Sequence, residues 1–457
     1  MPYRFVLVLF SILALATGCS SSNGDTVSGK GSVRGLHAIP ELGTVSFLIE
    51  ETVLSSLDYK DASGTSEYDD LNYDFNFDIL LPDDSETTRL ATRNLSVDAE
   101  SAYTFVLTGT FESPSIIVWE YFGRDWAQEL EDADEADTDV TVLEVAFGHI
   151  DAGLSALDVF LEAPGTSPAS ALPRGTIEHG ALLPPIEIVE GDYQLVLTPA
   201  GEPETILFAS EAIELLAATT NLFTMMDAGG MTTADFSVRW IGTSLGAELT
   251  DLFVHPELDV LHAAFGTGPV DVIVGDAFAA PFAAGLAWSG LSESAALDRE
   301  SEFLVVTPAG NPGIFLAQKE IDFQPGTYNR LLLAGLPGSL QTVLLSHDKR
   351  RLATHARVQV FHAAARFQTM DIYLAADDVD ITLTGPNVPS ALFGSGTGYV
   401  AREAGAYNVV LTAPGTKSII GGPFPVELEQ GRNYGIVVVD APDITAADIF
   451  VFDQTPE

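Results

Sequence analysis

Cysteine, basic residues and long apolar runs are all scarce in this 457-residue sequence. It has one cysteine, Cys19, and 20 lysines and arginines against 65 aspartates and glutamates, which gives a net charge of -45. A single cysteine excludes a disulfide framework and a zinc site built on several thiolates. The shortage of basic residues excludes a nucleic-acid binder that neutralises phosphates with clustered Lys and Arg. Beyond residue 18, no apolar run is long enough to cross a bilayer, which takes about 20 residues.

The composition is that of a folded protein. Apolar residues make up 46% of the chain and charged residues only 19%. Intrinsically disordered chains combine low hydrophobicity with many charges, so this class is excluded. At roughly 150 residues per domain, the length alone suggests about three domains.

The first 18 residues have the pattern of a secretory leader. Arg4 is the only charge, and an apolar core runs from Phe5 to Ala16. This core is too short for a permanent membrane helix. The sequence Ala16-Thr17-Gly18-Cys19 resembles the lipobox of bacterial lipoproteins, in which the cysteine is diacylated, for example with palmitate, and becomes the new N-terminus. We therefore expect Cys19 to be a lipid anchor; the alternative is an ordinary cleaved leader with a chance cysteine.

A polar stretch rich in Ser and Gly follows the leader and, with Cys19, predicts a lipidated, flexible tether over residues 19–31. Two or three acyl chains on one cysteine give stable anchoring. Ser20, rather than Asp, follows the cysteine. By resemblance to the enterobacterial sorting rule, this favours the outer membrane of a Gram-negative bacterium, on either its periplasmic or its cell-surface side.

An apolar run closed by a Pro/Gly turn recurs along the chain. Copies lie at Tyr193–Gly201, Phe303–Gly310 and Tyr407–Gly415, with a fainter one at Phe77–Asp84. A histidine precedes each copy, and successive histidines are about 100 to 113 residues apart. Because these landmarks keep one order, we interpret the chain as four tandem modules and not as three larger domains.

Within each module the apolar runs are short and bounded by Gly, Pro, Asp and Asn. Such spacing predicts an all-β fold of four tandem antiparallel β-sandwich (Ig-like) modules in an elongated arrangement. The predicted ranges are 32–128 for module 1, which is divergent, 129–140 for an acidic linker, 141–245 for module 2, 246–350 for module 3 and 351–457 for module 4. We expect neighbouring modules to touch only through short joints.

Module 4 carries the clearest family features. A His-Ala strand end at His362 and an Asp-Ile-Tyr strand at Asp371 precede the stretch Leu392-Phe393-Gly394-Ser395-Gly396 and the turn Thr412-Ala413-Pro414-Gly415. These features resemble domain-of-unknown-function family 4397, which occurs in tandem in secreted and surface bacterial proteins. The resemblance extends to module 3 and more faintly to modules 2 and 1. It implies an extracytoplasmic repeat protein. The family has no established activity, so the resemblance transfers no catalytic residue to this chain.

Repeated polar residues are the first candidate site. They are His37, His149, His262 and His362, together with Asp158, Asp271 and Asp371, of which module 1 has no copy. One interpretation makes each histidine a base or a ligand with the aspartate nearby. We favour a framework role, in which the histidine at a strand end hydrogen-bonds a carboxylate or a backbone carbonyl. A framework contact recurs wherever the framework does, and no second His or Glu stands at metal-ligand spacing.

The second candidate is Ser244. Gly242-Thr243-Ser244-Leu245-Gly246 matches the nucleophile-elbow pattern and follows the apolar run Phe236–Ile241. An elbow also needs a following helix and an α/β sheet, and neither is predicted. We expect Ser244 to be a turn residue at a module end, with a serine hydrolase as the alternative.

Charged residues crowd two of the joints. The joint between modules 1 and 2, where residues 127–136 have room for a short helix, carries the acidic run Glu129, Glu131, Asp132, Asp134, Glu135, Asp137 and Asp139. The run lacks the glycine of a calcium loop, so we expect a solvated spacer; loose divalent-cation binding is the alternative. The joint between modules 3 and 4 carries Lys349, Arg350 and Arg351, with Arg357. This basic cluster either pairs with nearby carboxylates or marks a contact surface.

The sequence therefore predicts a non-enzymatic, lipid-anchored envelope protein with a binding, adhesion or structural role and with no cofactor or metal. Its expected partners are the lipid bilayer, through acylated Cys19, and an unidentified protein or glycan, but not nucleic acid. The alternatives are a serine hydrolase and a calcium-dependent surface module.

Overall fold

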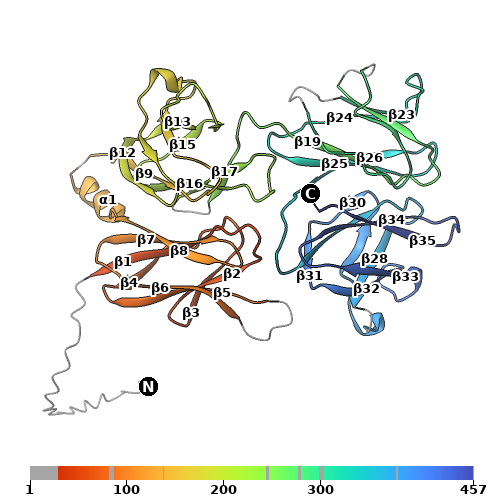
Figure 1. The fold of residues 1–457 in the computed structure, drawn as a ribbon, viewed down its shortest axis with the longest axis horizontal. Helices are drawn as coiled ribbons and strands as arrows, with labels where there is room; N and C mark the ends of the chain where they lie inside the picture. The colour runs from red at the N-terminus through yellow and green to blue at the C-terminus, as the bar shows by residue number, and fades with distance from the viewer. Residues whose placement is uncertain are drawn as a thin grey trace, which may run out of the picture.

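The fold is almost entirely β. The computed structural model describes residues 29–81, 87–136, 138–242, 246–275, 279–297, 303–376 and 379–455. Over these residues the chain forms four β-sandwich modules, each made of two sheets (Figure 1). The predicted fold class of tandem β-sandwich modules is confirmed.

Each module has one sheet that contains its first strand and one that does not; we call these the inner sheet and the outer sheet. In module 1 the inner sheet has the order β4 (Ser66–Asp69), β1 (Lys30–His37), β7 (Ser101–Gly109) and β8 (Pro114–Phe122). Its outer sheet has the order β3 (Thr52–Leu57), β2 (Val45–Ile49), β5 (Asn72–Ile79) and β6 (Thr88–Ser96).

Module 2 is the largest. Its inner sheet has the order β12 (Leu182–Val189), β9 (Val142–His149), β16 (Thr220–Asp227), β17 (Phe236–Ile241) and β18 (Ala247–Leu249). Its outer sheet has the order β11 (Gly175–Ile177), β10 (Leu157–Glu162), β13 (Gly191–Pro199) and β14 (Phe208–Ala209), with β15 (Ile213–Leu215) also paired to β13. The 3₁₀ turn η1 (Pro168–Ser170) lies between β10 and β11.

Modules 3 and 4 repeat this plan. In module 3 the inner order is β22 (Ala295–Ala296), β19 (Glu257–His262), β25 (Tyr328–Ala334) and β26 (Gln341–His347), and the outer order is β21 (Ala283–Leu286), β20 (Val270–Val274), β23 (Phe303–Pro308) and β24 (Ala317–Glu320). In module 4 the inner order is β30 (Ser395–Gly396), β27 (Ala356–His362), β34 (Asn433–Asp440) and β35 (Ala447–Asp453), with β31 (Val400–Arg402) also on β27. The outer order is β29 (Val388–Leu392), β28 (Thr369–Ala376), β32 (Gly405–Thr412) and β33 (Ile419–Leu428), and η2 (Ile381–Leu383) precedes β29.

One strand pair in each module is parallel, which differs from the fully antiparallel sandwich expected. The pairs are β1 with β7, β9 with β16, β19 with β25, and β27 with β34. Parallel neighbours need a long crossover, and in each module the outer sheet is that crossover. The other strand pairs recorded for the described residues are antiparallel.

The modules do not form an elongated rod, because their inner sheets pack face to face. Modules 1 and 2 share an apolar cluster that includes Leu36, Val106 and Trp119 from the first and Leu222 and Met226 from the second. Modules 3 and 4 share an equivalent cluster, which includes Leu261, Leu332, Phe361, Val437 and Val439. The two pairs lie side by side, so the four modules occupy the corners of a square (Figure 1).

Alternation along the strands explains this pairing. In β7, Phe105 and Leu107 face the core of module 1, whereas Val106 faces module 2. In β34, Ile436 and Val438 face the core of module 4, whereas Val437 and Val439 face module 3. An inner sheet with apolar residues on both faces must bury both of them, and the neighbouring module provides the second cover.

The strand order also determines where the chain leaves each module. In module 1 the first strand β1 runs parallel to β7, and β8 returns antiparallel, so Phe122 ends opposite Ser101, at the end where β1 began. Module 3 behaves in the same way. Module 2 has the additional strand β18, which pairs with β17 and carries the chain to the opposite end. It lies beyond the predicted limit of module 2 at residue 245.

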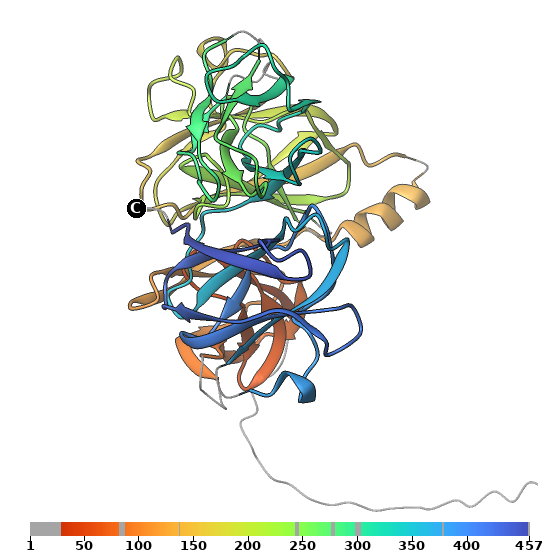
Figure 2. The same ribbon diagram turned by 90° about the vertical axis from the view of Figure 1, so that its right-hand side faces the viewer.

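The joint between modules 1 and 2 contains the helix α1 (Trp126–Glu135), which has no buried residue and projects from the body (Figure 2). Asp125 caps its N-terminus by accepting a hydrogen bond from the backbone N–H of Gln128. Within the described part of the chain, no helix has the length and apolar character needed to cross a membrane.

Candidate functional site

The four repeated histidines occupy equivalent positions at the ends of β1, β9, β19 and β27, and all are buried. In each, Nδ1 accepts a hydrogen bond from the backbone N–H two residues later, at 3.3 to 3.4 Å. In the first three, Nε2 donates to the carbonyl oxygen six residues later, on Gly43, Ser155 or Gly268. In the fourth copy, Nε2 has only a loose contact with the backbone of Phe367 in place of this bond. Each histidine therefore fastens the loop that leads from the inner to the outer sheet.

Burial keeps these histidines neutral. It lowers the pKa of His37 and of His362 to about 4. It also lowers the pKa of His149 and His262. A neutral imidazole has one donor and one acceptor, and the backbone loop occupies both in modules 1 to 3.

The repeated aspartates join pairs of turns in the outer sheets. Asp271 accepts hydrogen bonds from the backbone N–H groups of Gly285 and Gly310, at 2.7 and 2.8 Å. Asp371 accepts from Ser390 and Gly415, both at 2.7 Å. Asp158 does the same with the N–H of Gly201 at 2.7 Å and the hydroxyl of Thr176.

In modules 2 to 4, the Pro/Gly turn of the recurring apolar run is thus held by the repeated aspartate. Module 1 has Ser46 at this position, opposite Asp78. Over the described ranges, no recorded hydrogen bond or ion pair joins a repeated histidine to a repeated aspartate, so the structure does not bring them together as a catalytic pair. Their contacts fit the framework interpretation.

Two candidate residues, Cys19 and Ser244, lie outside the described residues, as does Asp137 of the acidic run. Most of the acidic run forms the exposed helix α1. Its Glu129 pairs with Arg124, which also bonds Glu187 of module 2 at 2.7 Å. No group of three or more metal-binding side chains occurs among the residues that the structure describes.

The basic cluster at Lys349–Arg351 and Arg357 both pairs with nearby carboxylates and forms a contact surface between modules. Lys349 pairs with Glu257 at 2.7 Å and lies 4.2 Å from the centre of the Tyr328 ring. Arg357 pairs with Asp348. Arg350 instead reaches module 1, where its Nε donates to the carbonyl of Pro40 at 2.6 Å and its Nη2 donates to the carbonyl of Leu42.

These contacts tie the two pairs of modules together. The backbone N–H of Ala353 also donates to the carbonyl of Glu41 at 2.7 Å, and that of Lys349 donates to Gly230 of module 2 at 2.7 Å. On the other side, the hydroxyl of Thr233 donates to the carbonyl of His255 at 2.7 Å. The links between the pairs are mainly polar, whereas those within each pair are mainly apolar.

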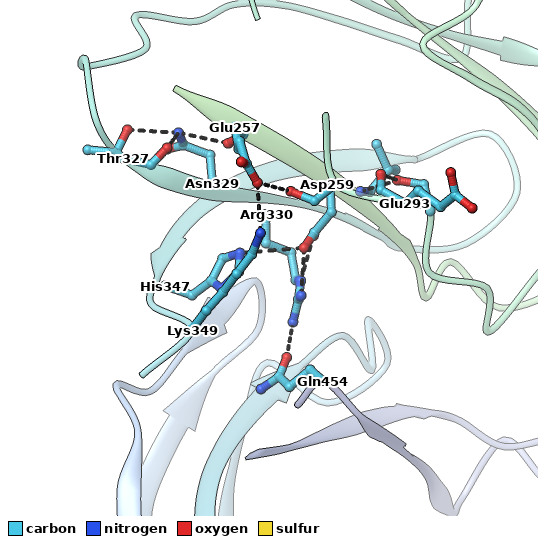
Figure 3. A network of polar contacts seen from close by, with 12 residues as sticks. Glu257, Asp259, Glu293, Thr327, Asn329, Arg330, His347, Lys349 and Gln454 are labelled. Atoms are coloured by element: carbon cyan, nitrogen blue, oxygen red, sulfur yellow. Dashed lines mark hydrogen bonds and ion pairs between the residues drawn. The ribbon is translucent and has the colours of Figure 1, made fainter. Parts of the chain in front are cut away.

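A second polar group lies between modules 3 and 4 (Figure 3). Arg330 donates two hydrogen bonds to the carboxylate of Asp259, at 2.6 and 2.7 Å, and a third to the side chain of Gln454 from module 4. Its guanidinium lies 5.2 Å from the ring centre of Phe452. Despite burial, the hydrogen bonds from Arg330 and His347 hold the pKa of Asp259 below its usual range. This charged group is enclosed in the interface, so it has no access to a substrate.

One open cavity, of about 490 Å³, lies where modules 1, 2 and 4 meet and is lined by two arginines; we call it the junction pocket. Module 1 contributes Asp58, Tyr59, Ile79 and Leu80 among others, module 2 contributes Met231, and the joint and module 4 contribute Arg350, Leu352, His355, Arg357, Tyr399 and Ala401. Sequence reasoning singled out the arginines but not the pocket, because its walls come from segments more than 300 residues apart.

The fold and these contacts define a protein of four tandem β-sandwich modules. Residues 256–373, which span module 3, the first strand of module 4 and part of its second, match the family described as domain of unknown function DUF4397. The predicted resemblance is confirmed for this part of the chain. No curated protein matches the sequence.

Two solved structures are similar at low scores. One is the Bacillus anthracis TIE protein, with 9% identity and a TM-score of 0.15, over 91% of this chain and 68% of that one. The other is a candidate cell adhesion protein from Parabacteroides distasonis, with 9% identity and a TM-score of 0.14, over 70% of this chain and 100% of that one.

Proposed function

We propose that this is a non-enzymatic binding protein of the cell envelope, held at the outer membrane through acylated Cys19 and presenting a preformed four-module body to a protein or glycan partner. The observation that carries the proposal is that the repeated histidines and aspartates are engaged in hydrogen bonds within the framework. His37, His149, His262, Asp271 and Asp371 bond the protein's own backbone.

Two further features support a binding role. Buried apolar clusters join the modules in pairs, so the surface is preorganised, which reduces the entropic cost of binding. The leader, Cys19 and the polar stretch up to residue 31 are the elements that a tethered envelope protein requires.

The anchor is tested by Cys19→Ala in cells that process lipoproteins. We expect the variant to leave the membrane fraction, because no acyl chain can be attached, whereas Ser22→Ala in the same stretch stays with the membrane. Retention of Cys19→Ala at the level of the unchanged protein contradicts the anchor.

The non-enzymatic part is tested with a serine-reactive phosphonate probe. We expect no labelling of the purified protein. Labelling that Ser244→Ala abolishes, and that Ser237→Ala leaves in place, replaces the proposal with a serine hydrolase. A rise in melting temperature in millimolar calcium chloride, absent in sodium chloride of equal ionic strength, instead favours the calcium-dependent module.

A further inference from the structure

The guanidinium of Arg350 has no recorded hydrogen bond to a carboxylate among the described residues. Burial lowers the pKa of Arg350 to about 10, and the charges of Asp348 and Asp58 act on it from a distance. Its recorded hydrogen bonds go to the carbonyls of Pro40 and Leu42, and its guanidinium lies 4.9 Å from the ring centre of Tyr59. Within the described ranges it has no ion pair, unlike its neighbours Lys349 and Arg357. Carbonyl dipoles and a ring face offset the loss of water only in part, so a partly buried guanidinium in this position attracts an anion.

The other charged groups of the junction pocket have no recorded hydrogen bond to the guanidinium of Arg350. Arg357 is neutralised by Asp348, with bonds from both terminal nitrogens. Asp58 is exposed, and its carboxylate accepts a hydrogen bond from the hydroxyl of Thr44 at 2.5 Å. Burial lowers the pKa of His355, so this side chain is neutral at pH 7.

Tyr399 also lines the junction pocket. Burial raises the pKa of its hydroxyl, which therefore stays protonated. Its ring lies 4.1 Å from the guanidinium carbon of Arg357, which fixes its orientation. A protonated phenol and a guanidinium are both donors suited to a carboxylate or a phosphate.

The remaining lining is apolar. Ile79, Leu80, Met231, Leu352 and Ala401 line the same pocket, and Leu80 is 57% exposed. A volume of about 490 Å³ lies within the range of roughly 300 to 1,000 Å³ typical of small-molecule sites, which favour module interfaces and combine apolar walls with a few polar groups.

We propose that the junction pocket binds a small organic anion, with its carboxylate or phosphate group at Arg350 and its apolar body against Leu80, Met231 and Leu352. This inference deepens the proposed binding role. It does not depend on the lipid anchor, so the two stand or fall in separate experiments. It also gives a role to a concave surface in a chain of net charge -45, where a guanidinium has no recorded ion pair with the described residues.

Calorimetric titration of the purified full-length protein tests the site with benzoate, phenyl phosphate and inorganic phosphate. Benzyl alcohol is the neutral match for benzoate. We expect benzoate or phenyl phosphate to bind at least tenfold more tightly than benzyl alcohol, and the stronger of the two identifies the anionic group. Inorganic phosphate is expected to bind more weakly than phenyl phosphate, because it makes no apolar contact. Equal binding of benzoate and benzyl alcohol, or binding of neither anion, overturns the proposal.

The variant that locates the site is Ala401→Trp, which fills the pocket and leaves the links from Arg350 to module 1 in place. We expect it to weaken anion binding at least tenfold, whereas Ala127→Trp on the exposed helix α1 has no effect. Arg350→Met is expected to remove the preference for anions; if it also separates the module pairs, Ala401→Trp still decides the matter. Unchanged binding in Ala401→Trp places the anion elsewhere and contradicts the proposal.

Discussion

The two module pairs are built on one plan, but they differ in the polar groups they bury between modules. Between modules 1 and 2, Trp119 inserts its ring against Gly148 and donates to the carbonyl of Gly180 at 3.0 Å. Lys60 crosses the same interface to Glu248 at 2.9 Å. Between modules 3 and 4 the buried polar group is that of Arg330 and Asp259, with Gln454. The tryptophan of this interface, Trp288, is 40% exposed and meets Phe450 edge-on.

This difference separates the apolar burial that both interfaces share from the polar groups that determine how the two inner sheets align. Both interfaces have apolar clusters at equivalent strands, so apolar burial is the common driving force. The polar groups are not equivalent, and a buried charge pair contributes little net stability compared with apolar residues of the same shape. We infer that Trp119 in one pair and Arg330 in the other set the register in which the two faces meet.

Removing one partner of the buried charge pair is expected to have the largest effect. Arg330→Met leaves the carboxylate of Asp259 buried without its main partner, at a cost of about 3–5 kcal/mol. Hydrogen exchange of β19, β25, β27 and β34 measures the loss, which is expected to spare modules 1 and 2.

The matched control is the double variant Arg330→Met with Asp259→Leu, which removes both charges. We expect it to recover most of the lost stability, because no unpaired charge remains. A double variant as unstable as the single one would show that the pair itself, and not the stranded charge, supports the interface.

An intermediate effect is expected in the other pair. Trp119→Phe loses the hydrogen bond to Gly180 and leaves a small cavity beside Gly148, which together cost about 2 kcal/mol. Phe122→Leu, at a side chain of module 1 that is 81% exposed, is the control and should change little. Calorimetry should show a lower unfolding temperature for modules 1 and 2 and an unchanged unfolding temperature for modules 3 and 4. A shift of both transitions by the same amount would mean that the pairs unfold as one unit.

The smallest effect is a pH dependence that the two pairs share. Burial lowers the pKa of His37 and of His362 from 6.5 to about 4. The unfolded chain therefore takes up protons below pH 6.5, whereas the folded chain does not until about pH 4, and stability falls as the pH falls between these values. From pH 6.5 to 5.5 the loss is about 1 kcal/mol for each of these histidines.

Denaturant unfolding across this pH range measures the slope, and His37→Gln or His362→Gln should each reduce it. Asp259, whose pKa is lowered from 3.8, contributes stability that is present above that value and lost only at more acid pH. An unchanged slope in both glutamine variants would assign the pH dependence to other groups.

Much of the fold followed from local pattern, and the arrangement of the modules did not. The recurring apolar runs and Pro/Gly turns predicted four sandwiches, because strand and turn signals are local. The expected elongated arrangement is wrong, because the inner sheets have a second apolar face that they bury against the neighbouring module. Runs such as Leu331–Ala334 and Ile436–Val439 are apolar at successive positions, and this is the signal that both faces of a strand are buried.

The candidate sites divide in the same way. A framework role for the histidines was predictable from repetition, whereas their backbone partners depend on the loop conformations. The contacts of Arg350 with module 1 were not predictable, since its partners Pro40 and Leu42 are 310 and 308 residues away in the chain. The lipid anchor at Cys19 and the role of Ser244 stay predictions.

The two apolar faces of each inner sheet have a consequence for how such proteins evolve. A single duplicated module would present an uncovered apolar face such as that of Leu261, Leu332 and Phe361, which invites aggregation. Duplication of two adjacent modules carries its own cover, because the inner sheets of the two modules bury each other's second apolar face. We expect viable relatives of this architecture to gain and lose modules in even numbers.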